Sequence, residues 1–449
     1  MNTSIECLGE PKIDSPLMTG RFVDDNERIL MDLSPDGLEE TLKAGTKPIS
    51  FMKAGAREKI FFDHSKLKCA VVTCGGLCPG LNNVIRSVVL TLYHDYKVRN
   101  ILGIRFGLQG FIPKYEHPVM DLTPDKVSDI NQFGGTILSS SRGPQDIGEI
   151  VDALERMNVG ILFAIGGDGT FRAAEKIADE IGRRNDRIGV IGIPKTIDND
   201  VSFLSQSFGF ATAVSAAAQA INSAHVEANG APNGVGLVKL MGRYSGFIAA
   251  TASLAKTYAN FVLIPEADFD LEGPHGLLAA LEKRLEEKKH AVIVVAEGAG
   301  QKYCCGDGAD ESGNPRLGDI GQYLKDTIAA HFKARGIELN LKYIDPSYLI
   351  RSVPATAQDS IFCGFLGQHA VHAGMAGKTN MVVGTWNEQF VYIPIRMVVT
   401  GRKQVDLKGS LWGSVLEATG QPSFRPDQEA SLIQRACCAA DLYGSGCAK

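Results

Sequence analysis

The chain lacks the features that mark secreted, membrane-spanning and nucleic-acid-binding proteins. No uninterrupted apolar run approaches the roughly 20 residues that a membrane-spanning helix needs. The N-terminal sequence MNTSIECLGEPK has no basic stretch followed by an apolar one, so it predicts no secretory signal peptide. The formal net charge of -5 gives no overall reason to expect a nucleic-acid partner. We therefore expect no nucleic-acid partner and no membrane association.

Cysteine is present, but not in a pattern that predicts disulfides or a metal site. Of the ten cysteines, Cys74 and Cys78 are four residues apart, and Cys304 and Cys437 each directly precede another cysteine. None of these spacings recurs as in zinc fingers, and no disulfide framework emerges. We interpret the cysteines as free thiols in a reducing compartment, and we predict a cytoplasmic location.

Glycine is the residue in excess, with 49 among 449 residues against a usual share of roughly 7%. Many of these glycines follow apolar runs in short clusters. The length is natural for two domains. From Lys66 onward, near-continuous Val and Ile runs alternate with helical patterns, which predicts parallel strands covered on both faces. We therefore expect an α/β fold of two doubly wound, mostly parallel-sheet lobes.

Residues 1–67 lack this alternation, and we interpret them as an N-terminal extension. Within it, SPDGLEETLKAG predicts a short helix with Ser34 as N-cap and a stop at Gly45. The expected strands are 66–76, 98–107, 159–167, 187–195, 233–242, 261–266, 291–298 and 381–386, and the expected helices are 81–96, 146–158, 171–184, 246–256, 275–289 and 320–336.

Three loops in the first half follow strands, the position where such sheets bind ligands. The first, CGGLCPGLNN, has Leu77 where the dinucleotide fingerprint needs glycine, so it is either a phosphate-binding loop or a plain tight turn. The second, IGGDGTFRAAE, places Asp168 among glycines and predicts Thr170 as the N-cap of a helix. A carboxylate beside bound phosphates indicates Mg²⁺, unless Asp168 simply caps the helix.

The third loop, PKTIDND, brings Asp198 and Asp200 to a strand end. An Asp-x-Asp pair at such a place fits a general base together with a metal or substrate contact. The segment SSSRGP adds Arg142, which either stabilises phosphate charge or is a solvated loop arginine. The second half contributes three further charged candidates, Arg243 in MGRYSG, Glu297 in VVAEG and Arg351 in YLIR.

Two other patterns do not predict sites. GMAGKT at 374–379 resembles a Walker A loop, but His372 stands where glycine is required, and a helix pattern precedes it where a strand should. We interpret this segment as the turn that ends a helix. His369 and His372 lie one helical turn apart without an acidic or thiol partner at matching spacing, so we interpret both as core or surface residues.

Together these segments resemble the phosphofructokinases. The resemblance rests on GGLCPGLNNVIR, SSSRGP, GGDGT, PKTIDND, MGRYSG and YLIR, in the family's order across about residues 66–400. One glycine-rich motif would be weak, whereas six in order are specific. The resemblance implies a phosphofructokinase-like fold and phosphorylation of the 1-hydroxyl of fructose 6-phosphate to fructose 1,6-bisphosphate, the committed step of glycolysis, with Mg²⁺ as cofactor.

The resemblance also implies roles for single residues. Asp198 resembles the base that takes the proton from the sugar 1-hydroxyl, and Asp168 and Asp200 resemble the carboxylates that organise Mg²⁺. Thr196 and Arg142 would steady the transferring phosphoryl group. The implied donor-binding residues are Gly75, Arg142, Gly143, Gly167, Asp168, Gly169 and Thr170. The implied sugar-phosphate contacts are Thr196, Asp198, Asp200, Met241, Gly242, Arg243, Glu297, Lys342, Tyr348 and Arg351.

Two residues disagree about the phosphoryl donor. Gly169 leaves room for the α-phosphate of ATP, where pyrophosphate users carry a second aspartate. Lys195 is instead typical of pyrophosphate users. ATP enzymes of the plant and trypanosomatid kind combine both features with an N-terminal extension and the form YIDPSYLIR, and this sequence resembles them. We therefore predict an ATP-dependent 6-phosphofructokinase, with a pyrophosphate-dependent enzyme as the alternative.

The sequence departs from the family pattern at Gly234, where a neighbouring subunit usually donates an arginine, and no clear adenine-stacking tyrosine occurs near RFGLQGF. Two rival functions are a lipid or NAD kinase and a catalytically inactive sugar-phosphate sensor. The first shares GGDGT but lacks TIDND followed by MGR. The second is disfavoured because Asp198, Asp168 and Arg142 are all present.

The resemblance also bears on assembly and domain limits. The resemblance implies an allosteric enzyme and a homo-oligomer, either a tetramer or a dimer, and Lys342 falls where relatives have an arginine from a neighbouring subunit. No ligand motif is readable in 1–67 or 401–449. The expected ranges are an extension at 1–67, a phosphoryl-donor lobe at 68–209 plus about 350–400, a fructose 6-phosphate lobe at 210–349 plus about 401–430, and a tail at 431–449.

Overall fold

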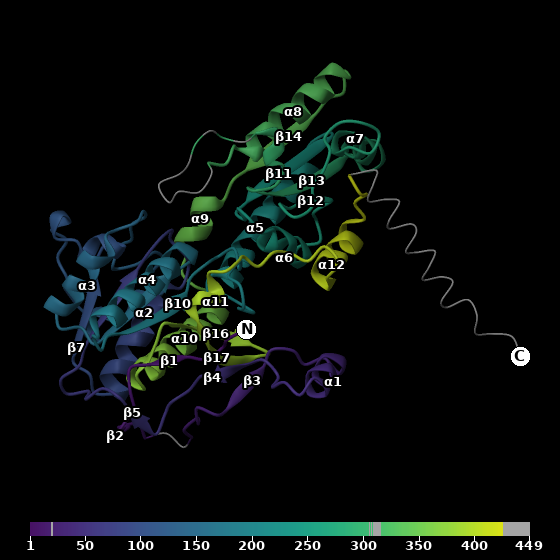
Figure 1. The fold of residues 1–449 in the computed structure, drawn as a ribbon. Coiled ribbons are helices and arrows are strands. Elements are labelled where there is room, and N and C mark those ends of the chain that lie inside the picture. Colours follow the sequence, from purple (N-terminus) through teal and green to yellow (C-terminus); the bar gives the residue numbers. More distant parts are fainter. Residues whose placement is uncertain (19–20, 305, 307, 309–315, 425–449) are drawn as a thin grey trace, which may run out of the picture. The chain divides into compact units, whose positions relative to one another are not determined.

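The computed structural model describes residues 1–18, 21–304, 306, 308 and 316–424. Within these residues the chain forms two compact units, whose elements are labelled in Figure 1. Unit 1 takes in residues 1–213 and 348–403, and unit 2 takes in residues 214–308, 316–347 and 404–424. The expected tail at 431–449 lies outside the described residues.

A nine-stranded sheet forms the centre of unit 1, with the strand order β3-β4-β17-β16-β10-β9-β6-β7-β8. Its central strands from β16 to β7 are parallel neighbours, and the outer strands are joined by antiparallel pairing. The strands are β3 Arg28–Leu30, β4 Ser50–Lys53, β6 Lys68–Thr73, β7 Asn100–Ile104, β8 Met120–Asp121, β9 Ile161–Gly166, β10 Gly189–Pro194, β16 Met381–Trp386 and β17 Gln389–Pro394.

Both faces of this sheet are buried, because successive side chains of a strand point to opposite faces. In β9, Leu162 and Ala164 belong to the core cluster that also holds helix residues from α3 and α4. Ile161 and Phe163, on the other face, lie against Gly374 of α10. The helices here are α1 Pro35–Lys43, α2 Leu81–Leu90, α3 Ile147–Arg156, α4 Asp168–Arg184, α9 Ser347–Ser352, α10 Ala357–Met375 and α11 Ile395–Val398, and α5 Phe210–Asn229 begins here and continues into unit 2.

Helix α4 shows how the sequence positions these helices. It begins at Asp168 with Gly167 as N-cap, so the expected N-cap at Thr170 is wrong. Thr170 lies in the first turn because its side chain covers Gly166, where an added Cβ would come within 2.1 Å of Thr170 Oγ1. Four buried residues of the helix are spaced three or four positions apart and therefore lie on one face, which packs on the sheet. They are Phe171, Ala174, Ile177 and Ile181.

Residues 1–67 contain more strands than the sequence predicted. The strands β1 Glu6–Cys7 and β15 Lys378–Thr379 pair, as do β2 Ile13–Asp14 and β5 Lys59–Ile60, while β3 and β4 extend the main sheet. These strands have two to four residues each, which is too short to show a periodic pattern. The predicted helix forms as α1, and Ser34 Oγ accepts a hydrogen bond from Gly37 N–H at 3.3 Å.

Unit 2 is built on a four-stranded parallel sheet with the order β12-β13-β11-β14. Its core consists of apolar residues from these strands and from the helices α7 and α8. The two mostly parallel sheets with their helices confirm the predicted fold class. The elements are β11 Gly234–Leu240, β12 Phe261–Leu263, β13 His290–Ala296, β14 Asn340–Ile344, α6 Phe247–Ala255, α7 Leu277–Lys288, α8 Ile320–Ala334 and α12 Ser410–Thr419.

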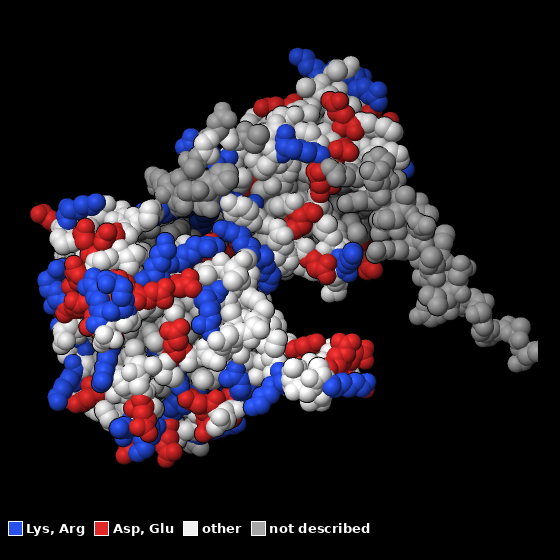
Figure 2. Space-filling model, viewed as in Figure 1, with Lys and Arg blue, Asp and Glu red and all other residues white. Residues whose placement is uncertain are grey.

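The surface carries charges of both signs. Figure 2 shows basic and acidic side chains interspersed over the visible face, in keeping with 46 Lys and Arg against 51 Asp and Glu in the whole chain. Among the described helices, none combines the length and the apolar character that crossing a bilayer requires. Among the cysteines in the described part of the chain, Cys7, Cys69, Cys74, Cys78 and Cys363 are free thiols.

Candidate active site

Three loops meet at one edge of the unit 1 sheet. The strands β10, β9 and β6 are parallel neighbours, with Pro194 paired to Gly166 and Ile165 paired to Thr73 at their carboxyl ends. The loops that follow these strands therefore start side by side. Backbone hydrogen bonds tie them together, since Lys195 N–H donates to Gly166 O at 2.9 Å. The segments 74–80, 167–170 and 195–208 thus form one continuous edge, as expected for ligand sites in such sheets.

The third of these loops is held by its own side chains. Thr196 Oγ1 donates to Asp200 Oδ1 at 2.9 Å and accepts from Asp198 N–H at 3.2 Å. Asn199 adopts a left-handed conformation with φ 56°, and its Oδ1 accepts from Ser207 N–H at 3.0 Å. The turn therefore fixes the backbone of Asp198 and buries Asp200, while Asp198 itself is half-buried.

Asp168 and Asp200 share a basic partner that the sequence did not reveal. Arg402 places Nη1 3.1 Å from Asp200 Oδ2 and Nη2 3.4 Å from Asp168 Oδ2. Arg172 approaches the same oxygen of Asp168 with Nε at 3.3 Å. Arg402 comes from the segment 401–430, where no ligand motif was readable. The only signal was the basic pair Arg402–Lys403, which is common on protein surfaces.

The two carboxylates fit a metal that is shared with a phosphate ligand. Mg²⁺ prefers oxygen donors and is commonly held by one or two carboxylates together with substrate phosphates. Asp168 Oδ1 is buried and has no hydrogen-bond partner among the described residues, so it is a ready donor. No cluster of three or more His, Cys, Asp or Glu suited to a metal occurs in the described part of the chain. The two carboxylates present therefore suit a site that is shared with substrate phosphates.

A group of cations surrounds the glycine loop after β6. Lys195 is buried, and its Nζ donates to Gly76 O at 2.8 Å. Burial lowers the pKa of Lys195, and repulsion from Arg351 and Arg142 acts in the same direction. Arg142 itself is exposed on its loop, where Gly143 has φ 87°. Positive charge beside a glycine-rich loop favours an anionic ligand.

The glycines of the site differ in what surrounds them. A Cβ at Gly169 would meet no heavy atom within 4 Å, so the space beside it is open. A Cβ at Gly167 would instead lie 3.3 Å from Lys195 O. Gly75 has φ 83°, and its N–H donates to Ser141 O at 3.1 Å. The amide of Gly75, which the resemblance assigned to donor phosphates, is thus already engaged within the protein.

Unit 2 brings its own candidates to one sheet edge. Leu240 and Ala296 are paired at the carboxyl ends of β11 and β13, and the segment Met241–Arg243 and Glu297 follow them directly. Glu297 N–H donates to Leu240 O at 2.8 Å, which joins the two loops. Gly242 has φ 132°, and a Cβ there would lie 2.4 Å from the Ser245 carbonyl oxygen, so this turn requires glycine.

The remaining predicted contacts come from other segments of the chain. Lys342 is exposed within β14, where it pairs with Gly236 two residues before the strand ends. Tyr348 is 85% exposed in α9, and Arg351 follows one turn later. Gly234 is confined by packing, because a Cβ there would lie 2.0 Å from Ala228 O. No side chain fits at this position, which gives a physical reason for its departure from the family pattern.

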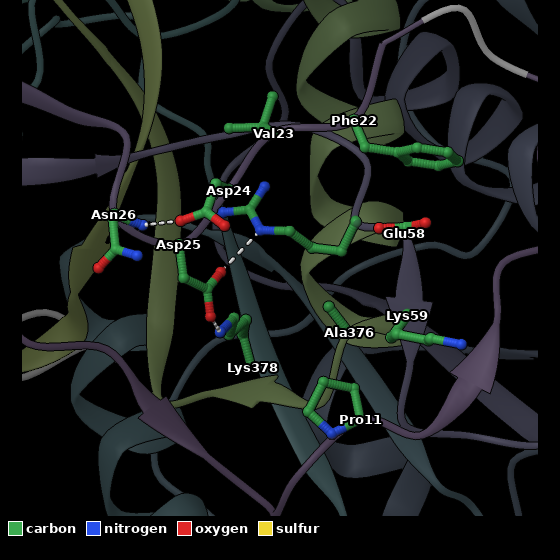
Figure 3. Close-up of a pocket in the computed structure, with 11 residues that line it drawn as sticks. Pro11, Phe22, Val23, Asp24, Asp25, Asn26, Glu58, Lys59, Ala376 and Lys378 are labelled. Carbon is green, nitrogen blue, oxygen red and sulfur yellow. Dashed lines mark hydrogen bonds and ion pairs between the residues drawn. The ribbon is translucent and has the colours of Figure 1, made fainter.

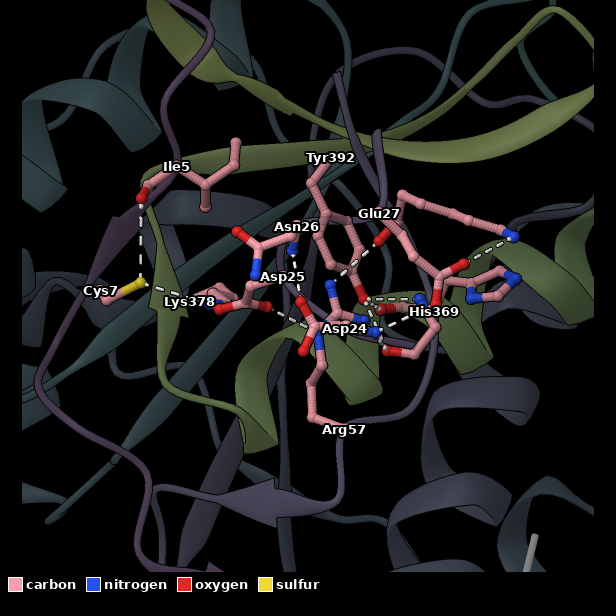
Figure 4. A network of polar contacts seen from close by, with 12 residues as sticks. Ile5, Cys7, Asp24, Asp25, Asn26, Glu27, Arg57, His369, Lys378 and Tyr392 are labelled. Atoms are coloured by element: carbon pink, nitrogen blue, oxygen red, sulfur yellow. Dashed lines mark hydrogen bonds and ion pairs between the residues drawn. The ribbon is translucent and has the colours of Figure 1, made fainter. Parts of the chain in front are cut away.

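A pocket of about 390 Å³ is lined mainly by residues of the N-terminal extension, together with Ala376 and Lys378 (Figure 3). Asp25 there pairs with Arg57 at 2.7 Å and with Lys378, whose Nζ also contacts Cys7 Sγ at 3.4 Å (Figure 4). Burial raises the pKa of Asp25, but hydrogen bonds from Lys378 and Arg57 outweigh it, so this pKa lies below its ordinary value. Asp25 is the shared partner of both buried cations, and we interpret the network as a brace for the extension.

A match to a known protein family agrees with the geometry of these strand-end loops. The family described as Phosphofructokinase matches residues 68–374. The chain belongs to the phosphofructokinase family. This confirms the resemblance drawn from the motifs.

Curated relatives of the phosphofructokinase family match most of the chain. A protein of Borreliella burgdorferi named ATP-dependent 6-phosphofructokinase is 52% identical over 437 residues, covering 94% of this chain and 97% of its own. A Trypanosoma cruzi protein of the same name is 45% identical, covering 93% and 87%. ATP-dependent 6-phosphofructokinase 4, chloroplastic, of Arabidopsis thaliana is 47% identical, covering 85% and 73%. These matches confirm the resemblance to plant and trypanosomatid enzymes.

Solved phosphofructokinase structures share the fold. The pyrophosphate-dependent phosphofructokinase of Marinobacter aquaeolei aligns with a TM-score of 0.65 at 19% identity, over 79% of this chain and 91% of that chain. The phosphofructokinase of Saccharomyces cerevisiae aligns with a TM-score of 0.60 at 21% identity, over 79% and 47%. At these identities the likeness shows the fold alone.

Proposed function

We propose that the chain transfers the γ-phosphoryl group of ATP to the 1-hydroxyl of D-fructose 6-phosphate, giving fructose 1,6-bisphosphate and ADP. The observation that carries this proposal is the turn in which Thr196 fixes Asp198 and Asp200 at the edge that also holds Asp168. Membership of the phosphofructokinase family and relatives named ATP-dependent 6-phosphofructokinase support the reaction.

Asp198 is the proposed general base. Its carboxylate accepts the proton of the sugar 1-hydroxyl while that oxygen attacks the γ-phosphorus, and a positioned base of this kind contributes about 10²–10⁴ in rate. The hydrogen bond from its N–H to Thr196 Oγ1 holds the residue in place. Thr196 and Arg142 steady the charge on the phosphoryl group. Phosphoryl transfer depends mainly on such positioning and charge neutralisation.

Asp168 and Asp200 would hold Mg²⁺ together with the donor phosphates. When bound, this ion would neutralise phosphate charge and orient the transferred group. Asp200 is only 8% exposed and is oriented by Thr196 Oγ1, so its position does not depend on the ion. The open Oδ1 of Asp168 supports the same arrangement.

The donor assignment depends on Gly169 and Lys195. The open space at Gly169 supports ATP, because an aspartate there would fill the place proposed for the α-phosphate. Lys195 lies under the Gly75–Gly76 loop, and its ammonium is bound by Gly76 O. It therefore supplies positive potential to that loop with either donor and does not by itself select pyrophosphate. The proposed donor contacts are Arg142, Gly143, Gly167, Asp168, Gly169 and Thr170, together with Gly75 if its N–H exchanges Ser141 O for a phosphate oxygen.

The sugar phosphate is proposed to contact residues from several segments. Lys342, exposed on β14, would serve a neighbouring subunit in a homo-oligomer, a tetramer or a dimer. The predicted cytoplasmic location stays a prediction, and one Arabidopsis thaliana relative is named chloroplastic. The other proposed contacts are Thr196, Asp198, Asp200, Met241, Gly242, Arg243, Glu297, Tyr348 and Arg351.

One assay tests both the reaction and the donor. The full chain with Mg²⁺ and fructose 6-phosphate should form fructose 1,6-bisphosphate much faster from ATP than from pyrophosphate. Asp198→Asn, which keeps the shape but not the charge, should lower turnover about 10²–10⁴-fold with little change in sugar-phosphate affinity. Asp179→Asn, on the exposed face of α4, is the matched control and should leave turnover unchanged.

The outcomes separate the parts of this proposal. A preference for pyrophosphate would refute the donor assignment and leave the acceptor assignment standing. Near-normal turnover of Asp198→Asn would remove Asp198 as the base. Absence of product from either donor, in protein shown to be folded, would refute the function as a whole.

A further inference from the structure

Arg402 joins the two carboxylates that the proposed function assigns to the metal. Its guanidinium reaches Asp200 Oδ2 with one terminal nitrogen, at 3.1 Å, and Asp168 Oδ2 with the other, at 3.4 Å. A single planar side chain thus spans two strand ends that come from β9 and β10. The planar guanidinium holds its N–H donors at fixed positions, so it suits such a bridge better than an ammonium does.

The backbone holds Arg402 at this place. Arg402 forms an isolated antiparallel bridge with Val201, and Lys403 N–H donates to Asp200 O at 2.8 Å. Lys403 Nζ donates in addition to Leu204 O at 2.8 Å. The segment 402–403 is therefore fastened to the Asp198–Leu204 turn along several contacts, so the approach of Arg402 to the carboxylates is built into the fold.

Among the described residues, cations offset the negative charges of Asp168 and Asp200 before any ligand binds. Asp168 and Asp200 carry two negative charges, and Arg172 and Arg402 carry two positive charges. Both oxygens of Asp200 are engaged, one by Thr196 Oγ1 and the other by Arg402. A divalent cation that binds Asp200 must therefore compete with Arg402, whereas Oδ1 of Asp168 stays open to it.

We propose that Arg402 is a positioning residue that holds Asp168 and Asp200 together while no metal is bound. Its ion pair with Asp200 breaks when a metal binds. The inference rests on the proposed function only in taking these carboxylates as the metal site. By neutralising them, Arg402 lowers their affinity for a free divalent cation. Metal then binds mainly together with nucleotide phosphates, which supply the missing negative charge.

Direct metal binding tests this proposal without turnover. Mn²⁺, titrated into the full chain without nucleotide or sugar and followed by electron paramagnetic resonance, should bind Arg402→Gln about three- to tenfold more tightly than the unsubstituted protein. Arg402→Lys keeps the charge but cannot span both carboxylates, so its affinity should lie between the two. In EDTA, Arg402→Gln should melt about 2–4 °C lower, and Mn²⁺ should restore its melting temperature.

Two further variants serve as controls. Arg183→Gln, on the same helix α4 as Asp168 but paired with Glu180, removes the same charge and should leave Mn²⁺ affinity unchanged. In an Asp200→Asn background, Arg402→Gln should tighten Mn²⁺ binding by a smaller factor, because Arg402 then faces the carboxylate of Asp168 alone.

Equal or weaker Mn²⁺ binding by Arg402→Gln would overturn the inference and make Arg402 a permanent brace. If Arg402→Gln does not fold, equal or weaker binding by Arg402→Lys is the refuting result. An error in the donor or acceptor assignment would show in the product assay and would leave these titrations unaffected.

Discussion

Asp359 offers a quantitative test of how the proposed active-site loop at 195–208 is held. It is a carboxylate with 0% exposure in the first turn of α10, and it caps the start of α5. Its oxygens accept hydrogen bonds from Gly209 N–H at 3.0 Å, from Thr212 N–H at 2.7 Å and from Thr212 Oγ1 at 2.6 Å. Phe208, the residue before these donors, bridges to Lys195, so the cap also fixes the far end of the 195–208 loop.

The loss of folding free energy on replacing Asp359 can be worked out from these contacts. Asp359→Ala leaves two backbone N–H groups without their acceptor, and a buried unsatisfied donor costs about 1–3 kcal/mol. The hydroxyl of Thr212 can turn toward Thr356 Oγ1 at 3.2 Å, so its loss is partly recovered. The carboxylate also loses its favourable place at a helix N-terminus, worth up to about 2 kcal/mol. We expect Asp359→Ala to lower the free energy of unfolding by about 4 kcal/mol, and Asp359→Asn by about half as much.

Urea unfolding followed by far-UV circular dichroism measures this change. The matched control is Gln358→Ala, whose exposed side chain neighbours Asp359 in the same helical turn. The control should change the free energy by less than about 0.5 kcal/mol. A loss below about 1 kcal/mol for Asp359→Ala would refute the reasoning, because it would mean that these donors find other acceptors.

Two other perturbations test the donor assignment and the pH dependence of folding stability. Gly169→Asp should raise KM for ATP about tenfold or more without lowering the melting temperature, since the site is open in the folded protein; an unchanged KM would contradict the crowding argument. Burial lowers the pKa of His369 to about 4 and that of His372 to about 3, so both stay neutral while the unfolded chain binds protons below its ordinary pKa of 6.5. Stability should therefore fall as the pH drops from 6.5 toward about 4, by up to about 1.4 kcal/mol per pH unit for each histidine. Urea unfolding across this range should show a shallower fall for His372→Gln, and equal slopes would contradict the assignment.

The sequence predicted the parts of the site that lie in short contiguous motifs. A strand that ends in glycines or aspartates can be recognised locally, and parallel neighbours bring such ends to one edge. The loops at Gly75, Asp168 and Asp198 were found in this way. The start of α4 was misplaced by three residues, because Thr170 has a capping residue's chemistry but lies in the first turn, where its side chain covers Gly166.

Contacts between distant segments could not be predicted in the same way. Arg402 contacts Asp168 and Asp200 although it lies more than two hundred residues away in the sequence. A backbone bridge to Val201 holds it there, and no local sequence pattern predicts that bridge. Asp359 caps α5 across a similar gap of about one hundred and fifty residues. The strands of residues 1–67 are too short for a period of two to show, and their pairing partners lie partly beyond residue 377. These features depend on tertiary packing, which local sequence patterns do not reveal.

Gly234 shows how packing can decide a functional question that sequence comparison leaves open. A missing family arginine at this position suggests a contact that was simply lost. The structure gives a stronger reason, because a Cβ there would lie 2.0 Å from Ala228 O and 2.7 Å from its carbonyl carbon, both backbone atoms of α5. No side chain can be placed without moving that helix away from β11. If a neighbouring copy offers a cation to the sugar phosphate, it must therefore come from another position, and we propose Lys342, which is exposed on the adjacent edge strand β14.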